Sequence, residues 1–351
     1  MRLEEPAWWY GPGGQLIARV LGPFAALWGG VATRSYERTA AYACALPVIC
    51  IGNFTAGGTG KTPLSLLVVS ELRQLGKQPA FLTRGYGGRL AGPHWVDAER
   101  DTAAQVGDEP LLLARRAPTL VSRDRAAGAR AIETSGRAID VIVMDDGLQN
   151  PALVKDLTLA LVDGRRGLGN GRVIPAGPLR APLDFQLDLA DAIVVNTSLA
   201  GATPSNGDVA EWLRSQFPGP VLSGSVDASA PVPWLEKASV VAFAGIGVPQ
   251  RFFDLLIRLG AKIEHALPFP DHHPFTDADA ERLLAMADRS SALLVTTEKD
   301  WARLGTDSAN LARLKQLSRP LPVAMTFDDR NRDRLLALIE AALVSRTAPR
   351  G

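Results

Sequence analysis

Cysteine is scarce in this chain: its 351 residues include two, Cys44 and Cys50. They flank a short apolar run that predicts a β-strand, and an extended strand of that length holds its ends too far apart for a disulfide. Two thiols are also too few for a tetrahedral zinc site. The shortage therefore indicates a reducing compartment, and we expect a cytosolic protein.

The chain also lacks an excess of charge of either sign. Lysine and arginine total 38 against 37 aspartate and glutamate residues, so no global basic field draws the protein to nucleic acid. With 46% hydrophobic and 21% charged residues, the composition is that of a folded globular protein long enough for two domains. We expect no nucleic-acid partner, and nothing in the sequence indicates an obligate protein partner.

Long hydrophobic runs are missing as well. The most membrane-like segment, QLIARVLGPFAALWGGVATR (15–34), holds only 14 uncharged residues between Arg19 and Arg34, and Pro23 is among them. A membrane-spanning helix needs roughly 20 apolar residues. We therefore expect this segment to lie on a surface and not to cross a bilayer.

From residue 47 onward, apolar runs alternate with helical stretches, which is the pattern of a parallel α/β sheet. Strands are predicted at 47–54, 78–84, 118–123, 138–144, 157–163 and 190–196, and a helix at 63–76. Crossovers of this length favour a doubly wound, mostly parallel sheet. A Ser-, Pro- and Gly-rich stretch at 219–236 predicts the passage to a second unit. We expect an N-terminal helical segment (1–38), a core domain (39–225) and a smaller α/β domain (226–351) that closes over the site.

The stretch TAGGTGKTP almost spells the phosphate-binding pattern G-x-x-x-x-G-K-[ST], with Thr55 at the first glycine position. Between a strand and a helix this pattern has a mechanism: backbone N–H groups face the phosphates, Lys61 reaches the β- and γ-phosphates, and Thr62 offers its hydroxyl to Mg²⁺. The alternative is a Gly-rich turn, but the flanking elements favour a P-loop NTPase-type core. The predicted nucleotide-binding residues are Thr55, Ala56, Gly57, Gly58, Thr59, Gly60, Lys61 and Thr62.

A P-loop protein also needs an acidic metal partner at the end of a neighbouring strand. The run AIDVIVMDDGLQN supplies Asp145 and Asp146 directly after an apolar strand. Two solvated acids that end a strand are the alternative interpretation. Mg²⁺ prefers carboxylates and water, so we predict a metal site here.

Three classes of P-loop protein then compete. A signalling GTPase should carry N-K-x-D late in its sheet, and neither VVNTSL nor TTEKDW fits that pattern. A partitioning-type ATPase has a signature lysine at the position of Ala56. A kinase that acts on a separate acceptor is left, with a P-loop ATPase that switches a protein partner as the alternative.

Such a kinase needs a base outside the P-loop, and two segments offer one. VGDEPLLLAR places Asp108 and Glu109 just before a helix, where acids that cap the helix are the alternative reading. PFPDHHPF places Asp271, His272 and His273 in a loop bounded by prolines. No third and fourth ligand follow at a spacing suited to zinc.

These motifs and several others occur together: TAGGTGKTP, TRGYGG, VGDEP, DDGLQ, VDGRRGLGNGRVIPAGPLR, AGIGVPQRFF, PDHHPF and TTEKD. In this order the sequence resembles tetraacyldisaccharide 4'-kinase, the lipid A kinase of Gram-negative bacteria, over almost its whole length. The resemblance implies ATP- and Mg²⁺-dependent phosphorylation of the 4'-hydroxyl of a tetraacylated glucosamine disaccharide 1-phosphate, giving lipid IVA.

The resemblance also implies roles for individual residues. Asp108 is the expected base toward the sugar hydroxyl, paired with His272, and Lys61 and Asp146 complete the expected catalytic set. Thr62, Asp145 and Asp146 are the expected metal ligands, and Arg84 and Arg180 the expected substrate contacts. Two positions depart from the family's usual pattern, because Ala181 stands where a glutamate is usual and Asn150 where a histidine is usual.

A lipid substrate gives the N-terminal segment a role. Apolar residues recur at helical spacing along one side of it: Ile17, Val20, Leu21, Phe24, Leu27, Trp28 and Val31. Packing of this amphipathic helix on the protein's own core is the alternative. The resemblance favours binding at a membrane surface, so we expect a peripheral or monotopic protein on the cytoplasmic face of the bacterial inner membrane.

Overall fold

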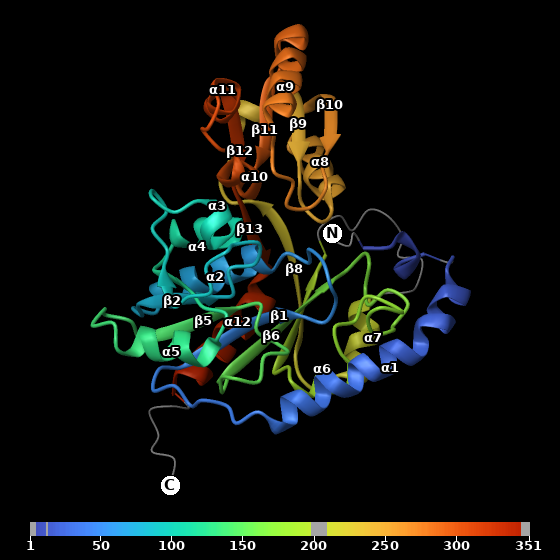
Figure 1. Cartoon of the computed structure of the whole chain (residues 1–351), viewed down its shortest axis with the longest axis vertical. Helices are drawn as coiled ribbons and strands as arrows, with labels where there is room; N and C mark the ends of the chain where they lie inside the picture. Colours follow the sequence, from blue (N-terminus) through green and yellow to red (C-terminus); the bar gives the residue numbers. More distant parts are fainter. Residues whose placement is uncertain (1–4, 12, 198–208, 345–351) are drawn as a thin grey trace.

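The computed structural model describes residues 5–11, 13–197 and 209–344. Two sheets organise the chain, a nine-stranded sheet in the larger body and a four-stranded sheet in a smaller body stacked on it (Figure 1). This arrangement confirms the predicted fold class, an α/β protein with a doubly wound, mostly parallel sheet and a second α/β unit.

The large sheet has the order β13-β8-β7-β6-β1-β5-β2-β4-β3. Its strands are β1 (Val48–Asn53), β2 (Pro79–Thr83), β3 (His94–Trp95), β4 (Thr119–Val121), β5 (Val141–Asp145), β6 (Leu157–Asp163), β7 (Ala192–Asn196), β8 (Val221–Ala228) and β13 (Val323–Phe327). All pairs are parallel except β13 with β8 and β3 with β4. Strand β1 lies between β5 and β6, so its carboxyl end opens at the centre of the sheet, where α/β proteins bind ligands.

The central strands are buried along their whole length and mostly apolar, because helices cover both faces of the sheet. In β6, Leu159 and Leu161 pack on one face, and Ala160 and Val162 pack on the other. Helices α2 (Lys61–Gln74) and α12 (Asp329–Val344) contribute to the first cluster. Further helices of this body are α3 (Ala103–Val106), α4 (Asp108–Ala114), α5 (Arg125–Glu133), α6 (Leu183–Asp188) and α7 (Val209–Gln216).

The smaller body is a parallel sheet of order β10-β9-β11-β12 with helices against it. Its strands are β9 (Ser239–Ala244), β10 (Lys262–Pro268), β11 (Leu293–Thr297) and β12 (Ser318–Leu321). Its helices are α8 (Pro249–Arg258), α9 (Asp277–Ser290), α10 (Glu298–Arg303) and α11 (Ala309–Leu317). Helix α10 lies at the lower edge of this body, next to α4 of the larger one (Figure 1).

The expected division at residue 226 assigned the rest of the chain to the smaller body. In the structure the chain instead returns to the larger body before its end. Strand β8 runs through that position, and β13 pairs with it in the large sheet, Met325 opposite Val226. Helix α12 then buries Leu335 and Ile339 in the core of the large sheet. The Ser- and Gly-rich composition of 219–228 concealed a strand, because β8 lies near the sheet edge and is only partly buried.

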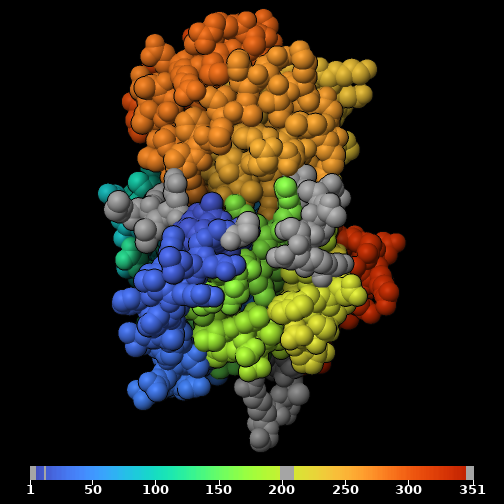
Figure 2. Space-filling model, turned by 90° about the vertical axis from the view of Figure 1, so that its right-hand side faces the viewer, coloured from blue at the N-terminus to red at the C-terminus, as the bar shows by residue number. Residues whose placement is uncertain are grey.

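The described part of the N-terminal segment holds a short 3-10 helix, η1 (Ala7–Trp9), and the long helix α1 (Gln15–Arg38), which continues through Pro23. Its small residues Ala18, Ala25 and Gly29 are buried against the larger body, and its large apolar residues face outward. Figure 2 shows α1 in blue across this surface. The exposed side chains include Leu16, Ile17, Val20, Phe24, Leu27, Trp28 and Val31. These side chains therefore do not pack on the protein's own core, whereas Leu21, which was expected on the same face, is half-buried.

The expectation that this segment is too short to cross a membrane is wrong in one respect. Helix α1 is long and apolar enough to do so by length and composition, with 24 residues that span about 36 Å. The count between Arg19 and Arg34 was too strict, since the helix extends past both and long arginine side chains can reach a membrane interface. In the structure α1 lies along the protein surface.

Candidate active site

The phosphate loop joins β1 to α2 in the expected way. Gly57 and Gly60 have φ of 93° and 98°, a region that favours glycine, and α2 begins at Lys61. Two polar residues at the ends of strands form hydrogen bonds to backbone carbonyls of the loop. Asn53 donates to the Thr55 carbonyl at 2.6 Å, and Asn196, which ends β7, donates to the Thr59 carbonyl at 3.0 Å.

Thr55 lies outside the turn that the glycines form. It is buried, pairs with Leu179 as an isolated bridge, and its carbonyl accepts from Arg180 Nε at 3.1 Å. The first position of the pattern therefore anchors the loop to the segment around Leu179. A threonine serves this purpose because the contact is made by its backbone.

The two acids after β5 face the loop. Lys61 Nζ lies 3.3 Å from Asp146 Oδ1, and Arg180 Nη1 lies 2.8 Å from the same oxygen. Burial would raise the pKa of Asp146, but Arg180 and Lys61 outweigh it and hold that pKa well below its ordinary value. Asp146 has φ of 54°, a conformation that costs a non-glycine residue on the order of 1–3 kcal/mol and is enriched at functional sites.

Asp145 lies in a different environment. It is buried and accepts a hydrogen bond from Ser65 Oγ at 3.0 Å. Burial, followed by the charges of Glu109 and Asp146, raises the pKa of Asp145 to about 7. Carboxylates crowded in this way favour a bound cation.

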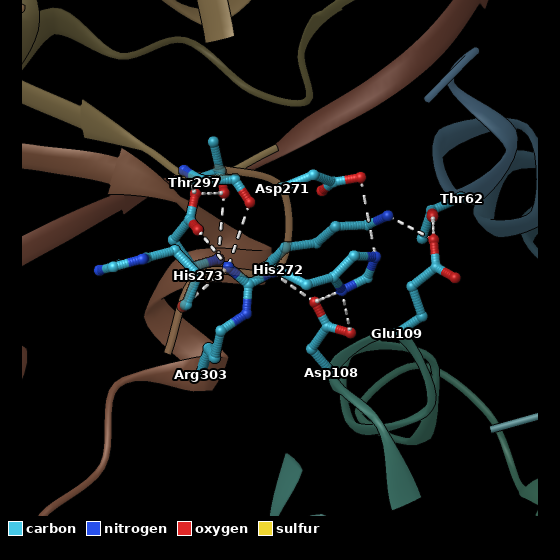
Figure 3. A network of polar contacts seen from close by, with 11 residues as sticks. Thr62, Asp108, Glu109, Asp271, His272, His273, Thr297 and Arg303 are labelled. Carbon is cyan, nitrogen blue, oxygen red and sulfur yellow. Dashed lines mark hydrogen bonds and ion pairs between the residues drawn. The ribbon is translucent and has the colours of Figure 1, made fainter. Parts of the chain in front are cut away.

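Asp108 begins α4, after Gly107. It is buried against the small body: His272 Nδ1 lies 3.0 and 3.1 Å from its two carboxylate oxygens, and Arg303 Nη2 lies 2.5 Å from Oδ2 (Figure 3). Burial opposes ionisation, but His272 and Arg303 hold the pKa of Asp108 far below its usual range. The hydrogen bond to Asp108 raises the pKa of His272.

Glu109 makes the next contact between the bodies. Its Oε1 accepts from Thr62 Oγ1 at 3.0 Å and also from Lys299 Nζ of α10. Figure 3 shows Thr62 and Glu109 facing each other beside the Asp108–His272 pair. Sequence reasoning assigned no role to Lys299 or Arg303, and it offered Glu109 as part of a segment that could supply a base or cap a helix. TTEKD was the one available signal for Lys299, and none pointed to Arg303.

A cavity of about 960 Å³ lies between the two bodies. It is lined by the predicted nucleotide-binding residues from Ala56 to Thr62 and by Arg84, Asp145, Asp146, Arg180 and His272. Thr55 and Asp108 do not line it, because Thr55 lies behind the loop and Asp108 is covered by His272 and Arg303. The volume suits a nucleotide together with part of a second substrate.

The segment before α1 also reaches this cavity. Glu5 lines it beside Gly57, and its Oε2 lies 2.9 Å from Arg166 Nη1. Burial is the main reason that the pKa of Glu5 is raised. The residues that precede α1 therefore form part of the wall of the nucleotide pocket.

Oxygen ligands for Mg²⁺ are gathered at the phosphate end of the cavity: the Thr62 hydroxyl and the carboxylates of Glu109, Asp145 and Asp146. Within the described part of the chain, no three His, Cys, Asp or Glu side chains are arranged as a metal cage. Mg²⁺ typically binds through one or two carboxylates and completes its shell with water and substrate phosphates. The residues present fit a metal ion that is held together with ATP.

Both positions that depart from the family's usual pattern lie in defined local contacts. Ala181 is buried, and its carbonyl accepts from Gln186 Nε2 at 2.8 Å. Asn150 accepts from the Ala152 N–H at 3.0 Å and so closes a turn. Neither residue lines the cavity.

The raised pKa of His272 predicts how stability depends on pH. A raised folded-state pKa means that the stabilisation is fully present below about pH 6.5 and is lost as the pH rises through the higher folded value. Thermal unfolding of the wild type and His272→Ala, followed from pH 5.5 to 9, should show a difference in Tm that shrinks with increasing pH. Arg116→Met breaks a different contact between the bodies, 3.3 Å from Glu298, and is the control that should show no such trend. A His272→Ala difference that grows with pH would contradict the assignment.

A phosphate loop whose cavity is also lined by an imidazole of the other body, backed by a carboxylate, is the arrangement of a P-loop enzyme that passes phosphate to a separate acceptor. The family model described as tetraacyldisaccharide-1-P 4'-kinase matches residues 17–341. The chain belongs to the tetraacyldisaccharide 4'-kinase family.

Individual relatives agree with this result. The tetraacyldisaccharide 4'-kinase of Nitrobacter hamburgensis is 47% identical over 327 residues, which cover 93% of this chain and 95% of the relative. That of Rhodopseudomonas palustris is 46% identical and covers 97% of both chains. The crystal structure of LpxK from Aquifex aeolicus in complex with ATP matches with a TM-score of 0.71 at 24% identity, over 93% of this chain and 99% of that one, and so supports the fold.

Proposed function

We propose that this protein transfers the γ-phosphate of ATP to the 4'-hydroxyl of tetraacyldisaccharide 1-phosphate, forming lipid IVA in lipid A biosynthesis. Family membership over residues 17–341 carries the proposal. The cavity supports it, since the phosphate loop and His272, which is paired with Asp108, line one space.

The reaction divides among the residues as follows. Backbone N–H groups of residues 55–62 and the Lys61 ammonium hold the phosphates. Thr62, Asp145 and Asp146 hold Mg²⁺, which neutralises charge on the transferring phosphoryl group when bound. Arg180, which contacts Thr55 and Asp146, binds substrate oxygens. Arg84, which directly follows β2, does the same.

In the transfer itself, the 4'-oxygen forms a bond to the γ-phosphorus while the bond from that phosphorus to the bridging oxygen of ADP breaks. The hydroxyl proton passes to the Asp108–His272 pair. His272 lines the cavity and Asp108 lies behind it, so the imidazole is the group that faces the hydroxyl and the carboxylate orients and stabilises it. Because the pair spans the two bodies, closure of the domains completes the site.

The decisive experiment incubates labelled ATP with tetraacyldisaccharide 1-phosphate and Mg²⁺. We expect label in the lipid in a one-to-one ratio with ADP, and little release of free phosphate when the lipid is omitted. Rapid phosphate release without lipid, and none transferred, would instead indicate an ATPase that switches a protein partner.

We further propose that α1 holds the enzyme on the cytoplasmic face of the inner membrane as a peripheral or monotopic protein. Its outward face carries large apolar side chains that the protein itself does not cover, such as Phe24, 63% exposed, and Leu27, 68% exposed. Basic residues on the same helix include Arg19, Arg34 and Arg38. From such a position the enzyme can bind a lipid substrate whose acyl chains stay in the bilayer.

Membrane binding should respond to detergent and not to salt. Each apolar side chain contributes roughly 1.5 kcal/mol or more when buried, whereas each basic residue near an anionic surface contributes about 1 kcal/mol. Replacing Phe24, Leu27 and Val31 with serine should therefore move most of the protein from the membrane pellet to the supernatant. Replacing Arg34 and Arg38 with glutamine is the matched control and should release little. Complete release of the wild type by 1 M salt would contradict insertion of α1.

A further inference from the structure

The charged residues that face the larger body from α10 are arranged in pairs with the acids of α4. Arg303 pairs with Asp108, and Lys299 pairs with Glu109, at sequence separations of 195 and 190 residues. Both acids lie in the first turn of α4. The smaller body thus supplies one cation, Lys299, to the wall of the nucleotide cavity and a second, Arg303, behind that wall.

The two cations differ in how firmly they are held. Arg303 is almost buried and is fixed within its own body by Asp300 Oδ1 at 2.8 Å and by the Gly245 carbonyl at 3.1 Å. Lys299 lines the cavity, and its side chain and that of Glu109 are 27% and 20% exposed. Arg303 is therefore held in place by contacts within its own body. Lys299 can exchange its partner without leaving the cavity.

The position of Lys299 points toward phosphate. The Glu109 oxygen that receives its ammonium also receives the hydroxyl of Thr62. Thr62 follows Lys61 in the first turn of α2, at the end of the loop where the β- and γ-phosphates bind. The Lys299 ammonium is therefore next to the phosphate end of the site.

We propose that Lys299 is a phosphate-directed cation which the smaller body supplies to the nucleotide site, and that Glu109 holds it there between turnovers. The proposal rests on the kinase function proposed above. When ATP and Mg²⁺ are bound, the metal ion is a second cation close to Glu109. The Lys299 ammonium then leaves the Glu109 carboxylate and binds an oxygen of the transferring phosphoryl group. Burial lowers the pKa of Lys299, but Glu109 and Asp108 outweigh it and raise that pKa above its usual value, so the side chain stays charged.

This arrangement couples chemistry to domain closure. Lys61 belongs to the larger body and Lys299 to the smaller one, so the γ-phosphate meets both cations only when the bodies are together. A positive group added at the moment of closure stabilises the transition state more than the bound ATP, because charge on the phosphoryl oxygens is redistributed during transfer. An open enzyme lacks that group and hydrolyses little ATP.

The test compares Lys299→Met with Lys299→Arg and with Arg116→Met. Arg116 pairs with Glu298 of the same helix α10 and does not itself line the cavity, so its variant weakens the contact between the bodies without removing a cation from the cavity wall. We expect Lys299→Met to lower kcat by roughly 10²–10³-fold while the KM for ATP changes little. Lys299→Arg should recover part of the loss, and Arg116→Met should keep wild-type kcat.

Calorimetry with ADP, Mg²⁺ and aluminium fluoride, a mimic of the phosphoryl group in transfer, provides a readout independent of turnover. The wild type and Arg116→Met should bind the fluoride complex more tightly than ADP alone, and Lys299→Met should lose that gain while still binding ADP. Wild-type kcat and fluoride affinity in Lys299→Met would overturn the proposal, as would equal losses in Lys299→Met and Arg116→Met. Failure of the wild type to label lipid would instead overturn the kinase function.

Discussion

Replacing Asp108 by asparagine should lower kcat by roughly 10²–10⁴-fold, with ATP binding nearly unchanged. Asparagine keeps the shape of the side chain but removes the charge that stabilises a protonated His272. Asp108 makes no contact with the phosphate loop, and its partners His272 and Arg303 both belong to the smaller body. The loss should therefore fall on transfer to the acceptor, measured as kcat with saturating lipid, with ATP affinity measured separately by calorimetry.

A double-mutant cycle tests whether the two residues act as a unit. His272→Ala should also lower kcat, and the double variant should be scarcely slower than Asp108→Asn, because members of one catalytic unit are not additive. Asp277→Asn changes an exposed first-turn acid of α9, away from the cavity, and serves as the control with wild-type turnover. Unchanged turnover in both Asp108→Asn and His272→Ala would refute the assignment.

Replacing Lys61 by alanine should reduce phosphate transfer by about 10²–10³-fold and also weaken ATP binding. The ammonium lies 3.1 Å from Asn53 Oδ1 and 3.3 Å from Asp146 Oδ1, at the junction of the loop, the metal ligands and the phosphates. Its loss leaves Arg180 as the neighbouring cation of Asp146. It also removes a positive charge that binds ATP in the ground state and stabilises the transition state still more. Both KM for ATP and kcat should therefore worsen.

The control for this variant lies on the same helix. Arg73→Ala removes an exposed basic residue from the last turn of α2, far from the loop, and should leave both constants unchanged. Circular dichroism establishes that the Lys61 variant is folded before its kinetics are compared. Wild-type transfer by Lys61→Ala would mean that the loop does not bind the triphosphate.

Much of the larger body follows from local sequence. Strand β1, the loop and α2 are continuous in the chain, so the pattern TAGGTGKTP and its flanking apolar residues were enough to place Lys61 and Thr62. The acids after β5 were also predictable, since parallel strands present their carboxyl ends at one edge. The strand from Leu157 to Asp163 has the predicted bounds because it is apolar throughout and buried on both faces.

Other features were not predictable for physical reasons. The pairing of β8 with β13 joins segments about a hundred residues apart, and the mixed composition of β8 gives no sign of its partner. Periodicity located an apolar face on α1 but could not say whether that face meets the protein or the solvent. The structure decides this, because Ala18, Ala25 and Gly29 permit close packing on the opposite side.

The sequence by itself predicted a phosphate loop between β1 and α2 and a pair of acids at the end of β5, because each of these depends on residues adjacent in the chain or on the geometry of a parallel sheet. Only the tertiary structure decided what surrounds Asp108 and Glu109. Their partners His272, Lys299 and Arg303 come from a separate body, and the contacts exist only because packing of α10 against α4 brings the charges together. A one-dimensional pattern records residue types, whereas the charge balance of this cleft depends on how two folded bodies meet.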